Sequence, residues 1–194
     1  QVAQVMRFPA CSSSQGYLMR HGAAPNASSS GTKVNQYTII MDILFPATST
    51  GFRSLWQTET NSTLTTDGDL FVNGANAIGV SGQYQGNFTP NAWHRVVFTL
   101  DLTTRELGKY IDGTNVLTSP VGVSPGSKPM QYLPSPEGLS DQRWALSTAA
   151  VLFSDENNET GVGYVNSIQF QDRVLSAAEI AALGGPAASG IPTS

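Results

Sequence analysis

The stretch that decides the fold runs from residue 91 to residue 101 and reads NAWHRVVFTLD. Alternate residues divide it into two faces, His94, Val96, Phe98 and Leu100 on one and Trp93, Arg95, Val97, Thr99 and Asp101 on the other. A period of two is what a β-strand with one buried face requires. The segment 109–113, KYIDG, predicts a second short strand that ends in Asp-Gly, a dipeptide that accepts positive φ and turns a hairpin tightly. Together the two segments predict a β-sandwich of antiparallel strands.

Further strands are expected on both sides of this hairpin. The segment 37–45 places five large side chains on one face, and Pro46 stops it. Segments 54–58, 70–73 and 78–81 predict short strands because Gly, Asn and Asp separate them. The nearly apolar segment 145–153 predicts a central strand. The last strand, 164–170, is expected to turn Tyr164, Ile168 and Phe170 inward and Val165, Ser167 and Gln169 outward.

One helix is expected, close to the C-terminus. Ser176 and Glu179 have the spacing of a capping box, in which each side chain accepts a hydrogen bond from the other's backbone N–H. Gly184 and the residues that follow it end the helix. The sequence therefore predicts one all-β domain over residues 1–186, a jelly-roll β-sandwich of two antiparallel sheets with one short C-terminal helix. Residues 187–194 are small and predict a tail or linker stub.

Composition narrows the class of protein. The chain has 194 residues, of which 40% are hydrophobic, enough to fill a core between two sheets. Only 12% are charged, against about a quarter in average domains, and such a surface is common in secreted proteins. The net charge of −4 and ten scattered Lys and Arg residues argue against nucleic acid, which binds clustered basic side chains. We expect a secreted protein whose export signal has been removed, or a module cut from a longer chain.

The sequence offers neither a membrane span nor a disulfide. No apolar run approaches the roughly 20 residues that cross a bilayer as a helix. Cys11 is the single cysteine, so an intramolecular disulfide cannot form. Both observations leave the β-sandwich to be stabilised by its core.

Four short motifs resemble, in their order along the chain, those of laminin G-like modules: WHRV at 93–96, YIDG at 110–113, GYVNSI at 163–168 and RVLSAAEI at 173–180. The match covers about residues 37–183, and the chain resembles bacterial members of the concanavalin A-like lectin/glucanase superfamily. The runs 35–38 and 183–186 further resemble modules appended to secreted bacterial hydrolases, including phosphoesterases. The resemblance implies a jelly roll of two curved sheets, often with a structural calcium and frequently with carbohydrate binding. One such sandwich hosts many activities, so the motifs specify the fold more than the function.

Catalytic signatures of that superfamily do not occur in the sequence. Its laminarinase-type enzymes carry the order Glu, any residue, Asp, two residues, Glu, and no such run is present. Its alginate lyases need Arg, Gln, His and Tyr on neighbouring strands, and neither His21 nor His94 has that context. We expect a non-catalytic, lectin-like module that binds a polysaccharide or another glycan, with a catalytic domain elsewhere in the same parent chain. The alternatives are a polysaccharide hydrolase or lyase, and a structural accessory domain of a secreted phosphoesterase.

Two acidic segments offer oxygen ligands. Asp155, Asn157 and Glu159 occupy alternate positions in an expected loop, where a tight turn would bring their oxygens to one side. Calcium accepts six to eight such ligands. The segment 67–69, Asp-Gly-Asp, is a second oxygen-rich turn. Solvated turns with Asx hydrogen bonds would explain both segments equally well. With the resemblance added, we expect a structural calcium held by Asp155, Asn157 and Glu159.

Carbohydrate binding needs an aromatic face for stacking, with amides or carboxylates for the hydroxyls. The polar stretch 82–88 supplies both, and its Tyr84 and Phe88 are expected to be exposed. Trp56 lies within an expected strand and favours the core. The predicted glycan-binding residues are Tyr84, Gln57, Gln83 and Asn87.

Overall fold

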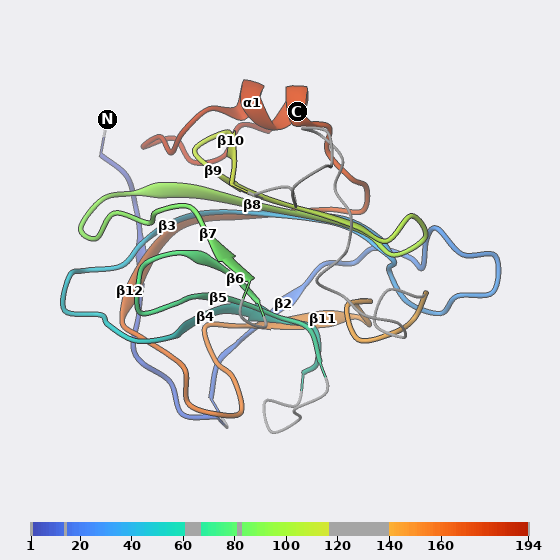
Figure 1. Cartoon of the computed structure of the whole chain (residues 1–194), viewed down its shortest axis with the longest axis horizontal. Coiled ribbons are helices and arrows are strands. Elements are labelled where there is room, and N and C mark those ends of the chain that lie inside the picture. The colour runs from blue at the N-terminus through green and yellow to red at the C-terminus, as the bar shows by residue number, and fades with distance from the viewer. Residues whose placement is uncertain (1, 14, 61–66, 81–82, 117–139, 194) are drawn as a thin grey trace.

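The computed structural model describes residues 2–13, 15–60, 67–80, 83–116 and 140–193. Two six-stranded antiparallel sheets lie face to face in it (Figure 1). Sheet A has the order β1 (Met6–Phe8), β12 (Gly163–Gln171), β3 (Gln36–Leu44), β8 (His94–Asp101), β9 (Glu106–Ile111) and β10 (Thr114–Asn115). Sheet B has the order β2 (Tyr17–Arg20), β11 (Ala149–Leu152), β4 (Arg53–Gln57), β5 (Asp69–Val72), β6 (Ile78–Val80) and β7 (Gln83–Gln85). The predicted sandwich of two antiparallel sheets is confirmed.

The core lies between the sheets and is built on the central strands of sheet A. Strands β3 and β8 pair in register, with Ile39 opposite Phe98 and Met41 opposite Val96. Directly opposite residues of an antiparallel pair project to the same face, so each pair adds to one apolar layer. The two strands contribute Tyr37, Ile39, Met41, Ile43, Val96, Phe98 and Leu100 to the core cluster, which confirms the faces expected from the period of two.

Strand β12 departs from its expected faces. A bulge between Val165 and Ser167 inserts one extra residue relative to β3. One extra residue reverses the alternation on one side of a bulge. Val165 therefore belongs to the core, and its expected outward orientation was wrong; Tyr164 is half-buried. Beyond the bulge the prediction holds, since Phe170 packs against the core and the hydroxyl of Ser167 reaches Asp42 on the outer side.

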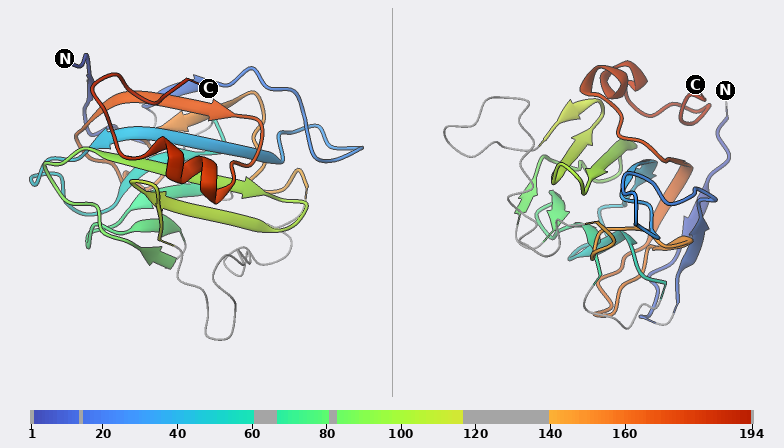
Figure 2. Two further views of the ribbon diagram at one scale, coloured as in Figure 1. Left: turned by 90° about the horizontal axis from the view of Figure 1, so that it is seen from above. Right: turned by 90° about the vertical axis from the view of Figure 1, so that its right-hand side faces the viewer.

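The outer face of sheet A is covered by the C-terminal segment. Helix α1 (Ala177–Leu183) begins with the predicted capping box, in which the Ser176 and Glu179 side chains accept from each other's backbone N–H. Figure 2 shows the helix lying across the strands of sheet A. The apolar side chains buried at this contact are Ile40, Val97, Tyr110, Leu175, Ile180 and Ile191.

The segment predicted as a tail also packs on sheet A over its described part, residues 187–193. The side-chain amide of Asn166 donates to the Ala187 carbonyl at 3.0 Å, and the Ile191 N–H donates to the Ser167 hydroxyl at 3.0 Å. Ile191 itself is buried. The residues after Pro186 therefore contribute to the structure of the domain.

A buried ion pair on sheet A holds the C-terminal segment in place. The Arg95 guanidinium donates to both oxygens of Asp42, each at 2.7 Å, and both side chains are almost inaccessible. The same guanidinium donates to the carbonyls of Leu183 and Gly190. Removing one partner of such a buried pair costs about 3–5 kcal/mol, because it leaves an uncompensated charge.

Among the described residues, no helix combines the length and the apolar character that a bilayer span requires. Helix α1 has seven residues. The described part of the chain therefore has no helical membrane span.

Candidate functional site

The outer face of sheet B carries the candidate site. On β5, Leu70 and Val72 belong to the core, which leaves Asp69 and Phe71 on the outer side. Phe71 lies opposite Gly79 of β6, and Gly79 lies opposite Tyr84 of β7. Phe71, Gly79 and Tyr84 thus form one row across three strands.

An exposed aromatic side chain lies against this row. The ring of Phe52, which precedes β4, stands edge-on to Phe71 at 6.2 Å and to Tyr84 at 5.7 Å between ring centroids. Phe52 keeps 41% of its surface exposed, and Tyr84 is half-buried. The result is an accessible aromatic surface that packs on the buried ring of Phe71.

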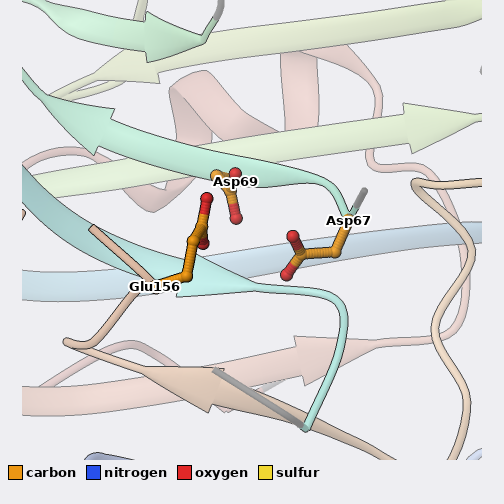
Figure 3. A group of neighbouring side chains, drawn as sticks. All are labelled: Asp67, Asp69 and Glu156. Atoms are coloured by element: carbon orange, nitrogen blue, oxygen red, sulfur yellow. The ribbon is translucent and has the colours of Figure 1, made fainter. Parts of the chain in front are cut away.

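Three carboxylates gather beside the aromatic surface. Asp67 lies in the turn before β5, Asp69 begins β5, and Glu156 follows β11. One oxygen of each lies within 4.8 Å of one oxygen of the others, and Figure 3 shows the three side chains pointing toward one another. Asp67 is buried, and Asp69 and Glu156 are half-buried. We call these three residues the carboxylate cluster.

Four of the six carboxylate oxygens in the cluster are buried without a hydrogen-bond partner. Both oxygens of Asp67, Oδ1 of Asp69 and Oε2 of Glu156 are buried and accept no hydrogen bond of normal geometry. Burial raises the pKa of Asp67 to about 7, and the neighbouring Glu156 adds to this rise while backbone amides oppose it. Burial likewise raises the pKa of Asp69 to about 8, assisted by the charges of Asp67, Glu156 and Asp155 and opposed by that of Arg143. A site of this kind binds protons or a cation to offset its charge.

Electrostatic contacts join the aromatic surface to the carboxylates. Burial, assisted by the charges of Glu159 and Asp69, raises the pKa of Tyr84 to about 12. These two carboxylates are therefore near the Tyr84 side chain. We define the aromatic–acidic patch as Phe52, Tyr84, Asp69, Glu156 and Glu159. It offers a stacking surface, a hydroxyl and several carboxylate acceptors within one area.

The predicted glycan-binding residues fall at different depths. Tyr84 and Gln83 are half-buried on β7, and Asn87 is exposed. Gln57 is fully buried on β4, where it lies opposite Asp69, and its Oε1 has no hydrogen-bond partner. The expected exposure of Phe88 was wrong, because its ring is buried in the core. Their contact with a glycan stays a prediction.

The three predicted calcium ligands also differ in their burial and in their contacts. Asp155 is fully buried, and its Oδ1 accepts from the Glu159 backbone N–H at 2.6 Å. Asn157 is exposed and donates to Oε1 of Glu156 at 3.1 Å. Glu159 lies near Tyr84 rather than in the carboxylate cluster. Calcium binding by Asp155, Asn157 and Glu159 stays a prediction. The carboxylate cluster instead takes Asp67 and Asp69 from the first acidic segment and Glu156 from the second.

Sequence reasoning missed Phe52 and Glu156. Phe52 follows Gly51, which has a φ of 78°, and its position beside Tyr84 depends on how β4 and β7 are placed in sheet B. Glu156 lies between Asp155 and Asn157, which were predicted as ligands because alternate residues point to the same side. That rule holds for an extended chain and not for a turn. The sequence did show two acidic turns, 67–69 and 155–159. In the structure these turns lie next to β5 and β11, the two strands that flank β4.

Comparisons with known proteins support the fold. No protein-family model matches the sequence, and no curated protein matches it. Trypanosoma rangeli sialidase is similar in structure, with a TM-score of 0.51 and 15% identity over 77% of this chain and 22% of the sialidase. The receptor-binding domain of botulinum neurotoxin D gives a TM-score of 0.54 and 12% identity over 92% of this chain and 42% of that one. NanB, solved with Optactamide, gives a TM-score of 0.51 and 14% identity over 78% of this chain and 24% of NanB.

These similarities show that the chain is a β-sandwich domain, a fold that it shares with parts of Trypanosoma rangeli sialidase, of NanB and of the toxin receptor-binding domain. At such identities the likeness concerns the fold alone. The chain spans less than half the length of each of these proteins.

Proposed function

We propose that this chain is a non-catalytic glycan-binding module and that the aromatic–acidic patch is its binding surface. The observation that carries the proposal is the exposed ring of Phe52 packed against Tyr84, whose side chain lies near the carboxylates of Glu159 and Asp69. A sugar ring presents an apolar face for an aromatic side chain and hydroxyl groups for carboxylate and amide oxygens. Gln83 and Asn87, on and just beyond β7, supply amides at the margin of this surface.

The arrangement of the two outer faces favours this assignment. The outer face of sheet A is occupied by α1 and the residues that follow it, whose apolar side chains are already buried. The half-buried and exposed side chains of the patch remain available on the other sheet. Interactions with a glycan on such a surface are shallow, so affinity in a larger protein gains from several copies acting together.

The similar structures support a role within a larger protein. This chain covers 22% of the sialidase and 42% of the toxin receptor-binding domain. We propose that the module is secreted and serves a catalytic domain in the same parent chain by holding it near its polysaccharide.

Binding to a panel of immobilised neutral and acidic polysaccharides tests this function. The wild-type chain is expected to be retained on at least one polysaccharide without releasing reducing sugar. Phe52→Ala and Tyr84→Ala are expected to weaken that binding roughly tenfold or more, which corresponds to about 1.4 kcal/mol. Tyr17→Ala is the matched control, because Tyr17 is 36% exposed on β2 and lies outside the patch. Retention that survives both patch substitutions would contradict the assignment of the surface.

A polysaccharide hydrolase is the second candidate, and one observation favours it. Asp69 has a pKa raised to about 8, so it is protonated at neutral pH as a general acid must be. Retaining glycosidases place their two carboxyl groups about 5–5.5 Å apart, with the scissile bond between them. In the carboxylate cluster a third group, Asp67, converges on the other two within 4.8 Å, which favours a bound cation over an open catalytic pair. Release of reducing sugar, or of unsaturated product in the case of a lyase, would replace the binding function with an enzymatic one.

A structural accessory domain, for example of a secreted phosphoesterase, is the remaining alternative. It predicts neither retention on any polysaccharide nor turnover. The same panel therefore separates all three functions.

A further inference from the structure

Four buried carboxylate oxygens without a donor lie at one place on the outer face of sheet B. They belong to the carboxylate cluster, Asp67, Asp69 and Glu156. Removing a carboxylate from water costs several kcal/mol unless another group offsets its charge. No described side chain donates a hydrogen bond of normal geometry to any of these four oxygens. A bound cation would offset their charge.

Asp67 provides an observation independent of the clustering itself. Asp67 is 3% exposed, neither of its oxygens accepts a hydrogen bond of normal geometry, and its carboxylate points toward Asp69 and Glu156 (Figure 3). A solvated surface turn would leave this carboxylate in water or give it an Asx hydrogen bond. The fold instead buries it toward two other acids. This geometry suits a ligand that the three oxygens share.

We propose that Asp67, Asp69 and Glu156 bind a calcium ion. Two oxygens on opposite sides of one calcium, each at 2.3–2.6 Å, are at most about 5.2 Å apart, so the spacing within 4.8 Å is compatible with a single ion. All three ligands are hard oxygens, as calcium prefers. Gln57 adds a fully buried amide oxygen without a partner at the strand position opposite Asp69. Backbone carbonyls and water complete the six to eight ligands that calcium accepts.

The position of the site explains what the ion does for the domain. Asp67 and Asp69 belong to the start of β5, and Glu156 belongs to the segment after β11. These two strands flank β4 on opposite sides. The ion therefore joins the two neighbours of β4 across its outer surface, next to Tyr84. This inference is independent of glycan binding, since the ion would stabilise a chain that binds no glycan at all.

Thermal unfolding of the full chain after EDTA treatment, with calcium or magnesium added back, tests the site. A ligand bound only to the native state raises the equilibrium constant for folding about 100-fold when its free concentration is 100 times its Kd. For a domain of this size, that corresponds to a Tm increase of roughly 5–10 °C. We expect this increase with millimolar calcium and a smaller one with magnesium. No change in Tm with calcium would overturn the proposal and leave the cluster neutralised by protons alone.

Substitution of a ligand should shift Tm in opposite directions with and without calcium. Asp69→Asn and Glu156→Gln each remove one of the mutually repelling charges, so in EDTA we expect Tm values equal to or above that of the wild type. In calcium the same variants are expected to melt below the wild type, with calcium affinity reduced at least tenfold. Asn157→Ala is the comparison variant: it removes the hydrogen bond that Asn157 donates to Oε1 of Glu156 but leaves all three carboxylates in place, so the calcium-dependent increase in Tm should persist. A calcium response that survives both variants and disappears in Asn157→Ala would move the site to Asp155, Asn157 and Glu159 and overturn this assignment.

Terbium luminescence supplies a second readout that does not depend on unfolding. The indole of Trp144 packs on Gly68, between the two aspartates, so closely that a Cβ on Gly68 would lie 2.6 Å from the ring. Terbium bound in place of calcium is therefore expected to emit on tryptophan excitation, and calcium is expected to quench the emission by displacement. The emission should fall at least tenfold in Glu156→Gln at the same terbium concentration. Equal emission from the variant would contradict binding at the carboxylate cluster.

Discussion

At the scale of single residues, Lys109 combines burial with charge. It is 1% exposed on β9 and lies opposite Phe98, so its side chain enters the space between the sheets. Its ammonium donates to the backbone carbonyls of Ile78 and Gln83 and to the side-chain oxygen of Gln85. All three acceptors are neutral, so hydrogen bonds, not a counter-charge, hold the ammonium there. Lys109 thereby connects sheet A to the β6–β7 hairpin that carries Tyr84.

The pKa of Lys109 predicts how stability depends on pH. Burial lowers this pKa from 10.5 to about 8. Between pH 8 and 10.5 the unfolded chain keeps a proton at this site that the folded chain has lost. The free energy of unfolding should therefore rise with pH across this interval, by up to about 1.4 kcal/mol per pH unit from this group. Urea unfolding at pH 7.0, 8.0 and 9.0 measures the slope.

Lys109→Met supplies the comparison for this prediction. The variant has no titrating group at the position, so the contribution of Lys109 to the slope between pH 8 and 9 should be absent. Identical slopes in the wild type and the variant would show that Lys109 has an ordinary pKa. Absolute stability is not the readout, because methionine also leaves the three acceptors without a donor.

At the scale of elements, the β6–β7 hairpin depends on Gly79. A Cβ at this position would lie 2.0 Å from the Gln83 carbonyl oxygen and 2.9 Å from Cα of Tyr84. These are backbone atoms and cannot rotate away. The close approach of β6 and β7 therefore requires glycine at position 79.

We expect Gly79→Ala to displace β7 and to destabilise the fold by about 1–3 kcal/mol, as overpacking of a closed site does. Displacement of β7 should also weaken any glycan binding, since Tyr84 moves with it. Gly74→Ala is the control, because the nearest atom to its added Cβ would be Cα of Gly51 at 3.8 Å. Urea unfolding of both variants is the measurement, and equal stability would show that β7 does not pack as described.

Comparison of the elements shows where a local sequence pattern is enough to predict a strand face or a helix start. The faces of β3 and β8 followed from a period of two because both strands are continuous and central, and the capping box of α1 followed from two residues three apart. In β12 the bulge at Asn166 moved Val165 into the core, and no local pattern marks that extra residue. Strand β11 covers only 149–152 of the apolar segment 145–153, since Leu146 instead bridges Val34 outside the named strands.

The candidate site was harder to predict because it is tertiary. The acidic turns at 67–69 and 155–159 were both visible as possible ligands. That Asp67 and Asp69 should meet Glu156 depends on β5 and β11 flanking β4, which is a property of sheet order. Tyr84 was identified from its polar neighbours, whereas its aromatic partner Phe52 lies 32 positions earlier and joins it only through the fold.

At the scale of the whole molecule, sheet A depends on its C-terminal cover. Ile180 of α1 is fully buried against a cluster that includes Ile40, Val97 and Tyr110. Ile180→Ala should lower the free energy of unfolding by about 2–5 kcal/mol, because it removes buried methyl groups and leaves a cavity. Urea unfolding measures the loss, and exposed Ala182→Ser is the control. A loss similar to that of the control would show that α1 contributes little to the stability of the sandwich.

Both described ends of the chain lie on the same side of the domain. Strand β1 is an edge strand of sheet A, and the residues around Ile191 pack on that sheet's outer face. The N and C labels of Figure 1 accordingly lie toward the side of α1. Phe52 and its neighbours lie on the outer face of sheet B, away from the side on which both described ends of the chain lie. A tether attached at either end would therefore leave that face accessible to an immobilised ligand.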